Sequence, residues 1–308
     1  GDLSDGRHMQ MVNFGAHYEG DFDGWLVTAA AGYTQGKNDF SAFYSTTNPV
    51  DGNAFANGYL NRAGGAPFGA TRFGYVLAGT STVYDPYADS GLVVSGQYRM
   101  SEANFYSAQG DLSVTRQIET GFGTHDLRVG AYTSFWGNDL LQAYQDMLIE
   151  VRSQPRLLDL NAYSATGAVL GSITQNGVLR YTTTLNQGEG DARMVAFYAN
   201  DTWDITEGLR IDAGIRHERY GYDGWAIPSV GPVNLGDPTT LADDQTRSLP
   251  NTVLRQELNP TATNWTVGAN YDFNGNLGVY GRISTLEVPP QHLGIALGIP
   301  ADRIETII

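Results

Sequence analysis

The chain has 308 residues, a formal net charge of −15 at pH 7 and no cysteine. An acidic chain is a poor partner for nucleic acid, because phosphate binding needs a basic surface. The lack of cysteine excludes thiolate zinc sites, iron–sulfur clusters and a cysteine nucleophile. No run of 18 or more apolar residues is present, so the sequence predicts no transmembrane helix.

The first predicted element is a β-hairpin. Apolar residues alternate with others from Gln10 to Tyr18, and again from Trp25 to Tyr33. The segment 20–24 between the two runs is rich in glycine and aspartate, which is typical of a tight turn. A period of two indicates strands with one apolar and one polar face.

The same pattern returns three times along the chain. Strands are predicted near 103–117 and 126–136, near 193–204 and 209–220, and near 261–273 and 277–285. The apolar face continues through Leu112, Val129, Phe197 and Val267, and Asp201 interrupts it at a position expected near the water interface. The sequence therefore contains about eight strands in four hairpins.

Short turns alternate with long connections, which cover 36–102, 137–192 and 221–260, with another beginning near 286. Strands of about 10–12 residues, tilted by about 40°, would cross a bilayer core. Trp25 and Tyr33 stand at opposite ends of one apolar face, where lipid-facing strands carry aromatic rings. The pattern predicts an all-β, antiparallel transmembrane β-barrel with short periplasmic turns and long extracellular loops. The alternative is a large soluble β-sandwich.

One helix is predicted inside the second long connection. Leu140, Leu141, Tyr144, Leu148 and Val151 fall at helical spacing. The pair at 138–139 offers a helix cap, and the proline at 155 would end the run.

Two segments resemble hairpins of the TonB-dependent receptor barrel. These are 197–218 (FYANDTWDITEGLRIDAGIRHE) and 264–284 (NWTVGANYDFNGNLGVYGRIS), followed by a similar motif at 301–306 (ADRIET). The family's pattern is an aromatic strand ending in acidic-x-Trp, a short turn, and a strand with Gly-x-Arg. The resemblance is looser over 1–136, where only the order of strands and loops supports it.

The resemblance implies a 22-stranded barrel in the outer membrane of a Gram-negative bacterium. Residues 1–308 are then expected to be a partial barrel domain, with the plug domain and the C-terminal strands lying outside this sequence. The implied partners are outer-membrane lipid, the protein's own plug, the TonB energy-coupling complex, and a small-molecule nutrient.

Charged residues alternate with the apolar positions and are expected on the inner face, because charges there can meet water instead of lipid. They are predicted to contact the plug or line the path of the ligand, and the alternative is a solvated wall of mutually paired charges. The predicted lumen-facing residues are Arg128, Arg210, Asp212, Arg216, Glu218 and Arg282.

Aromatic residues in the long connections are the candidate ligand contacts, since loop rings supply rigid binding area. The alternative is that these loops pack on one another. The candidates are Phe68, Phe73, Tyr75, Tyr84, Tyr87 and Trp225.

No enzyme motif is present: the chain has no HExxH, no G-x-S-x-G and no phosphate-binding loop. The segments 21–24 and 272–276 begin like calcium loops but lack the distal glutamate, so turns are predicted there. We expect no catalytic residue, metal or cofactor. The predicted function is nutrient uptake, such as that of an iron–siderophore complex, by TonB-coupled gating. The alternatives are a non-gated porin-like barrel and a secreted all-β carbohydrate-binding protein.

Overall fold

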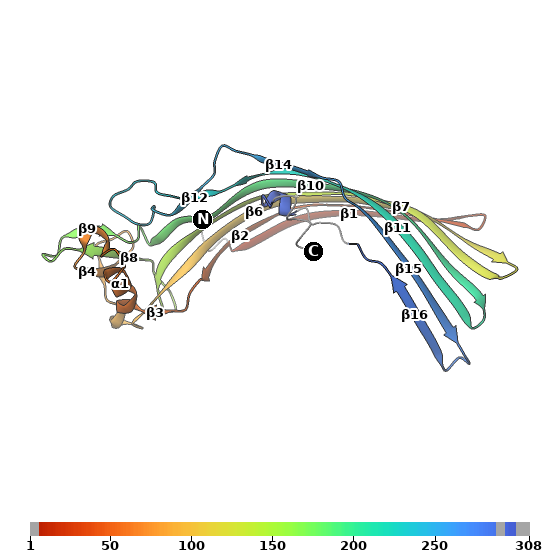
Figure 1. Cartoon of the computed structure of the whole chain (residues 1–308), viewed down its shortest axis with the longest axis horizontal. Coiled ribbons are helices and arrows are strands. Elements are labelled where there is room, and N and C mark those ends of the chain that lie inside the picture. Colours follow the sequence, from red (N-terminus) through yellow and green to blue (C-terminus); the bar gives the residue numbers. More distant parts are fainter. Residues whose placement is uncertain (1–5, 288–292, 300–308) are drawn as a thin grey trace.

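The computed structural model describes residues 6–287 and 293–299 of the chain. Eight long strands form one antiparallel meander in the order β1-β2-β6-β7-β10-β11-β15-β16 (Figure 1). Their bounds are β1 (Arg7–Phe22), β2 (Trp25–Ser45), β6 (Leu92–Thr120), β7 (Gly123–Glu150), β10 (Val178–Thr206), β11 (Leu209–Pro228), β15 (Thr261–Asp272) and β16 (Gly278–Ser284). β1 and β16 are the two edges of the sheet, which is therefore an open section of a barrel.

All the short turns lie at one end of the curved sheet, and the smaller elements lie towards the other (Figure 1). The turn between β1 and β2 needs left-handed backbone at Asp23 (φ 57°) and Gly24 (φ 80°). Gly275 (φ 75°) serves the turn between β15 and β16 in the same way. The residues at 21–24 and 272–276 thus form turns, as predicted.

The smaller elements belong to the long connections. The strands are β3 (Val50–Asp51), β4 (Arg72–Leu77), β5 (Val83–Tyr84), β8 (Leu158–Tyr163), β9 (Val169–Ser172), β12 (Val230–Val233), β13 (Thr246–Ser248) and β14 (Leu254–Leu258). The helical segments are α1 (Gly52–Leu60), η2 (Pro67–Gly69), η3 (Pro86–Ala88) and α2 (Leu293–Ala296). No helix within 6–287 or 293–299 is long and apolar enough to span a membrane.

The predicted apolar face is exposed along the whole sheet. Phe14 is 69% exposed, Val129 53%, Phe197 63% and Ile283 65%. We call this the outer face. A row of apolar side chains open to the surroundings would be costly in water and suits a lipid-facing surface. This exposure contradicts the alternative of a soluble β-sandwich, in which the same side chains would be buried.

Rings mark the turn end of the outer face. The guanidinium of Arg116 lies 4.5 Å from the ring centre of Trp25, and His125 stacks on Trp203 at 5.0 Å. Asp201, which interrupts the apolar pattern, has Oδ2 2.8 Å from Nδ1 of His125. One carboxylate oxygen of Asp201 thus has a partner on the neighbouring strand, whereas Oδ1 is buried and has no hydrogen-bond partner among the described residues.

The opposite, inner face is polar and more crowded, as expected inside a curve. Ser113 is 1% exposed, and Ala196 is completely buried. The Tyr198 hydroxyl donates to both carboxylate oxygens of Asp111, at 3.0 and 3.1 Å. A Cβ at Gly130 would stand 2.4 Å from that hydroxyl, so the glycine lets the tyrosine lie across the neighbouring strand.

The strands are longer than predicted. β6, β7 and β10 have 29, 28 and 29 residues and take up much of the predicted loops. Beyond Tyr33 the outer face of β2 becomes polar, with Gln35, Lys37 and Asp39. Both faces of the strand are polar there, so the sequence no longer alternates between apolar and polar residues. The backbone pairing of β2 with β6 nevertheless continues to Ser45.

The helix predicted around Leu140 to Val151 is wrong, because residues 123–150 form β7. Leu140, Tyr144 and Leu148 are spaced by four, so they fit a helical stripe and one face of a strand equally well. Pairing with β6 on one side and β10 on the other supplies the backbone hydrogen bonds that settle the choice.

Charge on the outer face should destabilise the protein in lipid. Val267 is 44% exposed on the outer face between the rings of Trp265 and Tyr271, whereas its neighbour Thr266 points to the inner face beside Gly214. We expect Val267→Arg in the full-length protein to cost about 2–4 kcal/mol if this position lies near the bilayer midplane, and Thr266→Arg to cost much less. Reversible folding into vesicles measures both, and equal losses would show that the faces are assigned incorrectly.

Candidate functional site

Two long connections build a loop module at the end of the sheet away from the short turns. β4 and β5 come from the connection before β6, and β8 and β9 from the one after β7. Together they form a four-stranded sheet in the order β5-β4-β8-β9, seen beside α1 in Figure 1. The buried core of the module is Ala56, Tyr75, Tyr84, Val93, Leu148, Leu158, Leu160 and Ile173.

Four of the six aromatic candidates belong to this core or pack against it. Tyr75 and Tyr84 are 4% and 8% exposed, and Phe68 and Phe73 are partly buried against the same cluster. Their position agrees with the alternative that the loops pack on one another. A direct role in ligand binding stays a prediction for these residues.

The other two candidates lie elsewhere. Tyr87 is 52% exposed, and its hydroxyl donates to Asp51 Oδ2. Trp225 belongs to β11, and its Nε1 donates to Glu189 Oε2 at 3.0 Å. The alternation of β10 and β11 places this pair on the outer face, so the structure does not bring Trp225 together with the loop aromatics.

Asp159 ties the two connections together. Its Oδ2 accepts the backbone N–H of Gly79 at 2.9 Å. Its Oδ1 accepts the Thr174 hydroxyl at 2.8 Å and the N–H of Gly177 at 2.7 Å. The residue is 7% exposed, so these three donors compensate for burial of the carboxylate. Asp159 therefore holds the module as one unit.

Asp51 also accepts hydrogen bonds that fix a loop, here at the start of α1. Its Oδ1 accepts the N–H of Ala54 at 2.8 Å, which is a helix cap. The hydrogen bond from the Tyr87 hydroxyl, followed by that from Ala54, holds the pKa of Asp51 below its ordinary value.

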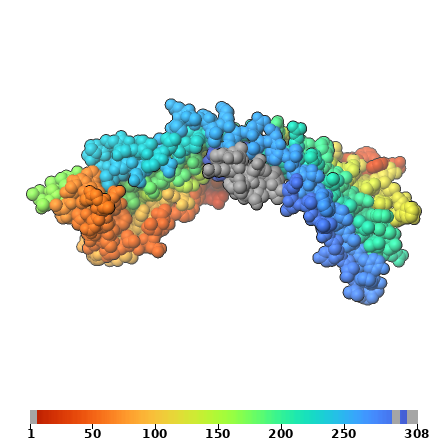
Figure 2. Space-filling model, in the orientation of Figure 1, coloured from red at the N-terminus to blue at the C-terminus, as the bar shows by residue number. Residues whose placement is uncertain are grey.

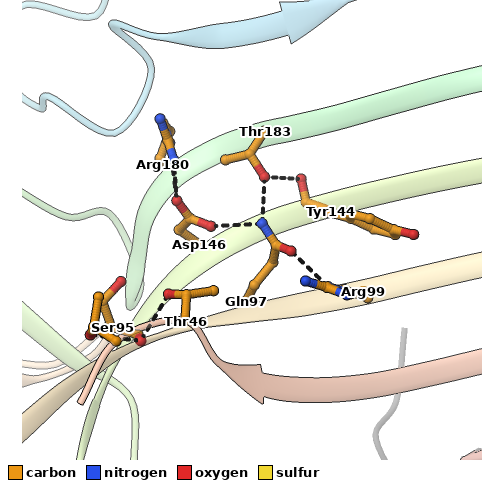
Figure 3. Close-up of polar contacts among 9 residues, drawn as sticks. Thr46, Ser95, Gln97, Arg99, Tyr144, Asp146, Arg180 and Thr183 are labelled. Carbon is orange, nitrogen blue, oxygen red and sulfur yellow. Dashed lines mark hydrogen bonds and ion pairs between the residues drawn. The ribbon is translucent and has the colours of Figure 1, made fainter. Parts of the chain in front are cut away.

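Below the module, the inner face carries a polar cluster (Figure 3). Arg99 lies between two rings, with its guanidinium carbon 4.8 Å from the ring centre of Tyr44 and 5.1 Å from that of Tyr144. Its Nε donates to Gln97 Oε1 at 2.7 Å. Gln97 in turn donates through Nε2 to Asp146 Oδ1 at 3.1 Å. The rings and the amide hold the guanidinium in one orientation.

A cavity of about 480 Å³ adjoins this cluster between the sheet and the loops. Arg180 reaches Asp146 with Nη2 at 2.6 Å from Oδ2 and lines the cavity with Arg62. Burial raises the pKa of the Tyr59 hydroxyl, and the charges of Arg62 and Arg180 oppose that rise. The remaining lining residues are Thr46, Thr47, Tyr59, Ser95, Asp146, Ile173, Leu179, Leu241, Asp244 and Gln245.

The arginines of this region outnumber their carboxylate partners. Arg180 is paired with Asp146, but within the described residues no carboxylate lies within ion-pair distance of Arg62 or Arg99. A chain of net charge −15 thus has two arginines without a carboxylate ion-pair partner in this region, Arg99 on the inner face and Arg62 in the connection that lines the cavity. We name Arg62, Arg99 and Arg180 the mouth arginines. Their arrangement can receive an anionic group.

All six predicted lumen residues lie on the inner face. Arg128 lies 3.9 Å from Asp111, Arg210 pairs with Asp204 at 2.6 Å, and Arg216 pairs with Glu218. The Asp212 carboxylate accepts the Thr202 hydroxyl at 3.1 Å. Arg282 is exposed on β16. Four of the six are thus in ion pairs, as a solvated wall would have, and contact with a plug stays a prediction.

The mouth arginines were missed by sequence reasoning because they lie inside segments assigned to loops. A usable signal was present in the alternation of β6 and β7. Gln97 and Arg99 occupy one face of β6, while Tyr144 and Asp146 occupy the same face of β7 in register. Among the described residues, no group of three or more His, Asp or Glu side chains is arranged to hold a metal ion.

The family comparison decides the assignment. The model of the TonB-dependent receptor-like β-barrel matches residues 1–294. The chain belongs to the TonB-dependent receptor β-barrel family. No match was found among curated proteins.

Two solved structures of similar fold are forms of the ferric-catecholate import receptor Fiu from E. coli K12. The closed form has 17% identity and a TM-score of 0.57 over 94% of this chain. The open form has 16% identity and a TM-score of 0.52 over 92% of this chain. The alignments cover only 34% and 36% of those receptors, so this chain spans about a third of their length.

Removing the Asp159 carboxylate should loosen the loop module. Asp159→Ala leaves the N–H groups of Gly79 and Gly177 without their acceptor, at a cost of about 1–3 kcal/mol for each buried donor left unpaired. We expect faster proteolysis and hydrogen exchange at 78–80 and 174–178, with the exchange of β7 and β10 unchanged. Unchanged exchange at both turns would contradict the role given to Asp159.

Acid should release the start of α1. The pKa of Asp51 is lower in the folded loop than in an unfolded chain, so its contribution to stability is complete above about pH 4. That contribution is lost as the pH falls through the lowered pKa. Hydrogen exchange in α1, corrected for the intrinsic rate, should rise over this interval in the unmodified protein. Asp51→Asn is the control and should show no such step.

Proposed function

We propose that this chain is part of the wall of an outer-membrane receptor that takes up an anionic iron chelate of the siderophore type. Family membership and the exposed outer face support a lipid-embedded barrel. The observation that carries the ligand class is the set of mouth arginines, two of which have no carboxylate partner in the described residues. Charge-assisted hydrogen bonds from guanidinium to carboxylate or catecholate oxygens would hold such a ligand.

TonB-coupled gating belongs to the same proposal. The inner-face charges would contact a plug domain supplied by the full-length protein, and the plug would move when the energy-coupling complex pulls on it. No covalent chemistry is involved. Family membership favours this receptor over a non-gated porin, and the exposed apolar face argues against a secreted carbohydrate-binding protein.

Arg99 supplies the test of the ligand class. In the full-length receptor, Arg99→Gln should weaken binding of an anionic ferric catecholate by about 10- to 100-fold, the equivalent of one charge-assisted hydrogen bond of about 1.5–3 kcal/mol. Arg282→Gln is the matched control, since it removes an exposed inner-face arginine on β16, which lies at the opposite end of the molecule from the loop module (Figure 1). Equilibrium binding of the radiolabelled chelate to outer-membrane vesicles measures both variants.

Two results would contradict the proposal. One is equal binding by the two variants and the unmodified receptor. The other is equal affinity of the unmodified receptor for a neutral ferric hydroxamate, because an anion site should prefer the anionic chelate. Energy coupling is checked separately: collapse of the proton-motive force should stop uptake and leave binding unchanged.

A further inference from the structure

Part of the inner face is apolar, which is unusual for a barrel interior. Ala192, Met194, Tyr220, Tyr222 and Ala262 are buried in one cluster, and Tyr132, Trp136 and Leu258 pack against it. These side chains come from β7, β10, β11, β14 and β15. Apolar surface facing a water-filled lumen is unfavourable, so a patch of this kind calls for a cover.

The cover is residues 293–299 of the same chain. Ile295 is 1% exposed and Ala296 is completely buried, and Ile299 packs against the same cluster. The short helix α2 contacts β7, β10 and β11. It is the dark blue coil near the middle of the curved sheet, which Figure 1 draws as a ribbon and Figure 2 as a space-filling model in the same orientation.

Two glycines fit the sheet to this segment. A Cβ at Gly188 would stand 2.2 Å from the carbonyl oxygen of Ala296, and a Cβ at Gly224 would stand 2.8 Å from Cγ2 of Ile295. Neither glycine has a positive φ, so the backbone conformation does not require glycine at either position. At Gly188 the close approach of 293–299 is therefore the main structural reason for glycine. At Gly224 the carbonyl oxygen of Glu189 on β10 would lie even closer to a Cβ, at 2.2 Å, so the neighbouring strand and the segment both favour glycine there.

Among the described residues, a single side-chain hydrogen bond joins the segment to the sheet. Gln256 Nε2 donates to the carbonyl oxygen of Ile299 at 2.8 Å. The N–H groups of Gly298 and Ile299 are satisfied within the segment, by the carbonyls of Ile295 and Gly294 at 3.0 and 2.9 Å. A small apolar contact with a single hydrogen bond to the sheet can form and break without unfolding the strands around it.

We propose that residues 293–299 form a latch that seats on the inner wall of the barrel mouth and must leave that seat for a ligand to pass. The seat is the surface around Gly188, Gly224, Met194, Tyr220 and Tyr222. The latch narrows the lumen at the level of these residues, on the inner face that also carries the mouth arginines. The transport part of this proposal rests on the proposed function, whereas the seating of the latch does not.

A disulfide tests the seating, and the absence of cysteine from the chain makes the test clean. A Cβ at position 298 would stand 3.8 Å from Cβ of Pro228, which is about the mean separation in disulfides. In the full-length receptor, Pro228→Cys with Gly298→Cys should therefore cross-link on oxidation of outer membranes. The matched control pairs Gly298→Cys with Ile227→Cys, on the opposite face of the same strand, and should not cross-link.

Because Gly298 has a φ of +71°, a cysteine there is strained, and a second measurement avoids that position. Ile295→Cys should be alkylated slowly by a membrane-impermeant maleimide. Adding Ala226→Leu, which enlarges a buried residue of the seat facing Gly298, should speed alkylation about tenfold. Heat-modifiable gel mobility verifies that each variant is a folded barrel.

The outcomes separate the two proposals. Cross-linking that stops uptake, with recovery on reduction, is the expected result. Failure of the cross-link together with fast alkylation of Ile295→Cys would overturn the seat, whatever the receptor transports. A cross-link that leaves uptake unchanged would overturn the latch. If the unmodified receptor takes up no ferric chelate, the proposed function fails while the cross-link still decides the seating.

Discussion

The structure depends on one constraint, which is that every backbone N–H and C=O in a lipid environment needs a partner within the protein. The antiparallel ladder from β1 to β16 meets it for the six inner strands, while β1 and β16 each keep one open edge. Once the ladder is set, alternation sends each side chain to one of two surroundings. The outer face can then be apolar and exposed, and the inner face polar and hydrogen-bonded, within the same strands.

Arginines concentrate in one region of a chain whose overall charge is negative. The protein is strongly acidic, yet Arg62 and Arg180 line the cavity between the inner face and the loop module, and Arg99 joins Arg180 through Gln97 and Asp146. Lower on the same face, Arg210 and Arg216 are neutralised by carboxylates on their own or a neighbouring strand. The ion pairs of Arg210 and Arg216 thus compensate charge within the wall, whereas Arg62 and Arg99 have no carboxylate ion-pair partner among the described residues.

The loop module and the latch are attached to the sheet by contacts of different extent. Residues of two connections share one small core around Leu158 and Leu160, and Asp159 ties the turns of both. The shared core and the buried hydrogen bonds make the loop module rigid. Residues 293–299 instead rest on the wall through Ile295 and one side-chain hydrogen bond from Gln256, which suits a segment that moves.

The sequence by itself determined the eight strands, the position of the short turns and the side of each strand that is apolar, because the period of two is local and strong there. It did not determine strand length, since alternation between polar residues such as Lys37 and Asn38 carries no contrast. It misassigned the region around Leu140 to helix, because a spacing of four suits both structures and only pairing with β6 and β10 decides between them. Tertiary structure alone showed that Tyr75 and Tyr84 are core, that His125 pairs with Oδ2 of Asp201, and that Arg99 lies between Tyr44 and Tyr144. Each of these joins residues far apart in the chain, and no local pattern records which strands become neighbours.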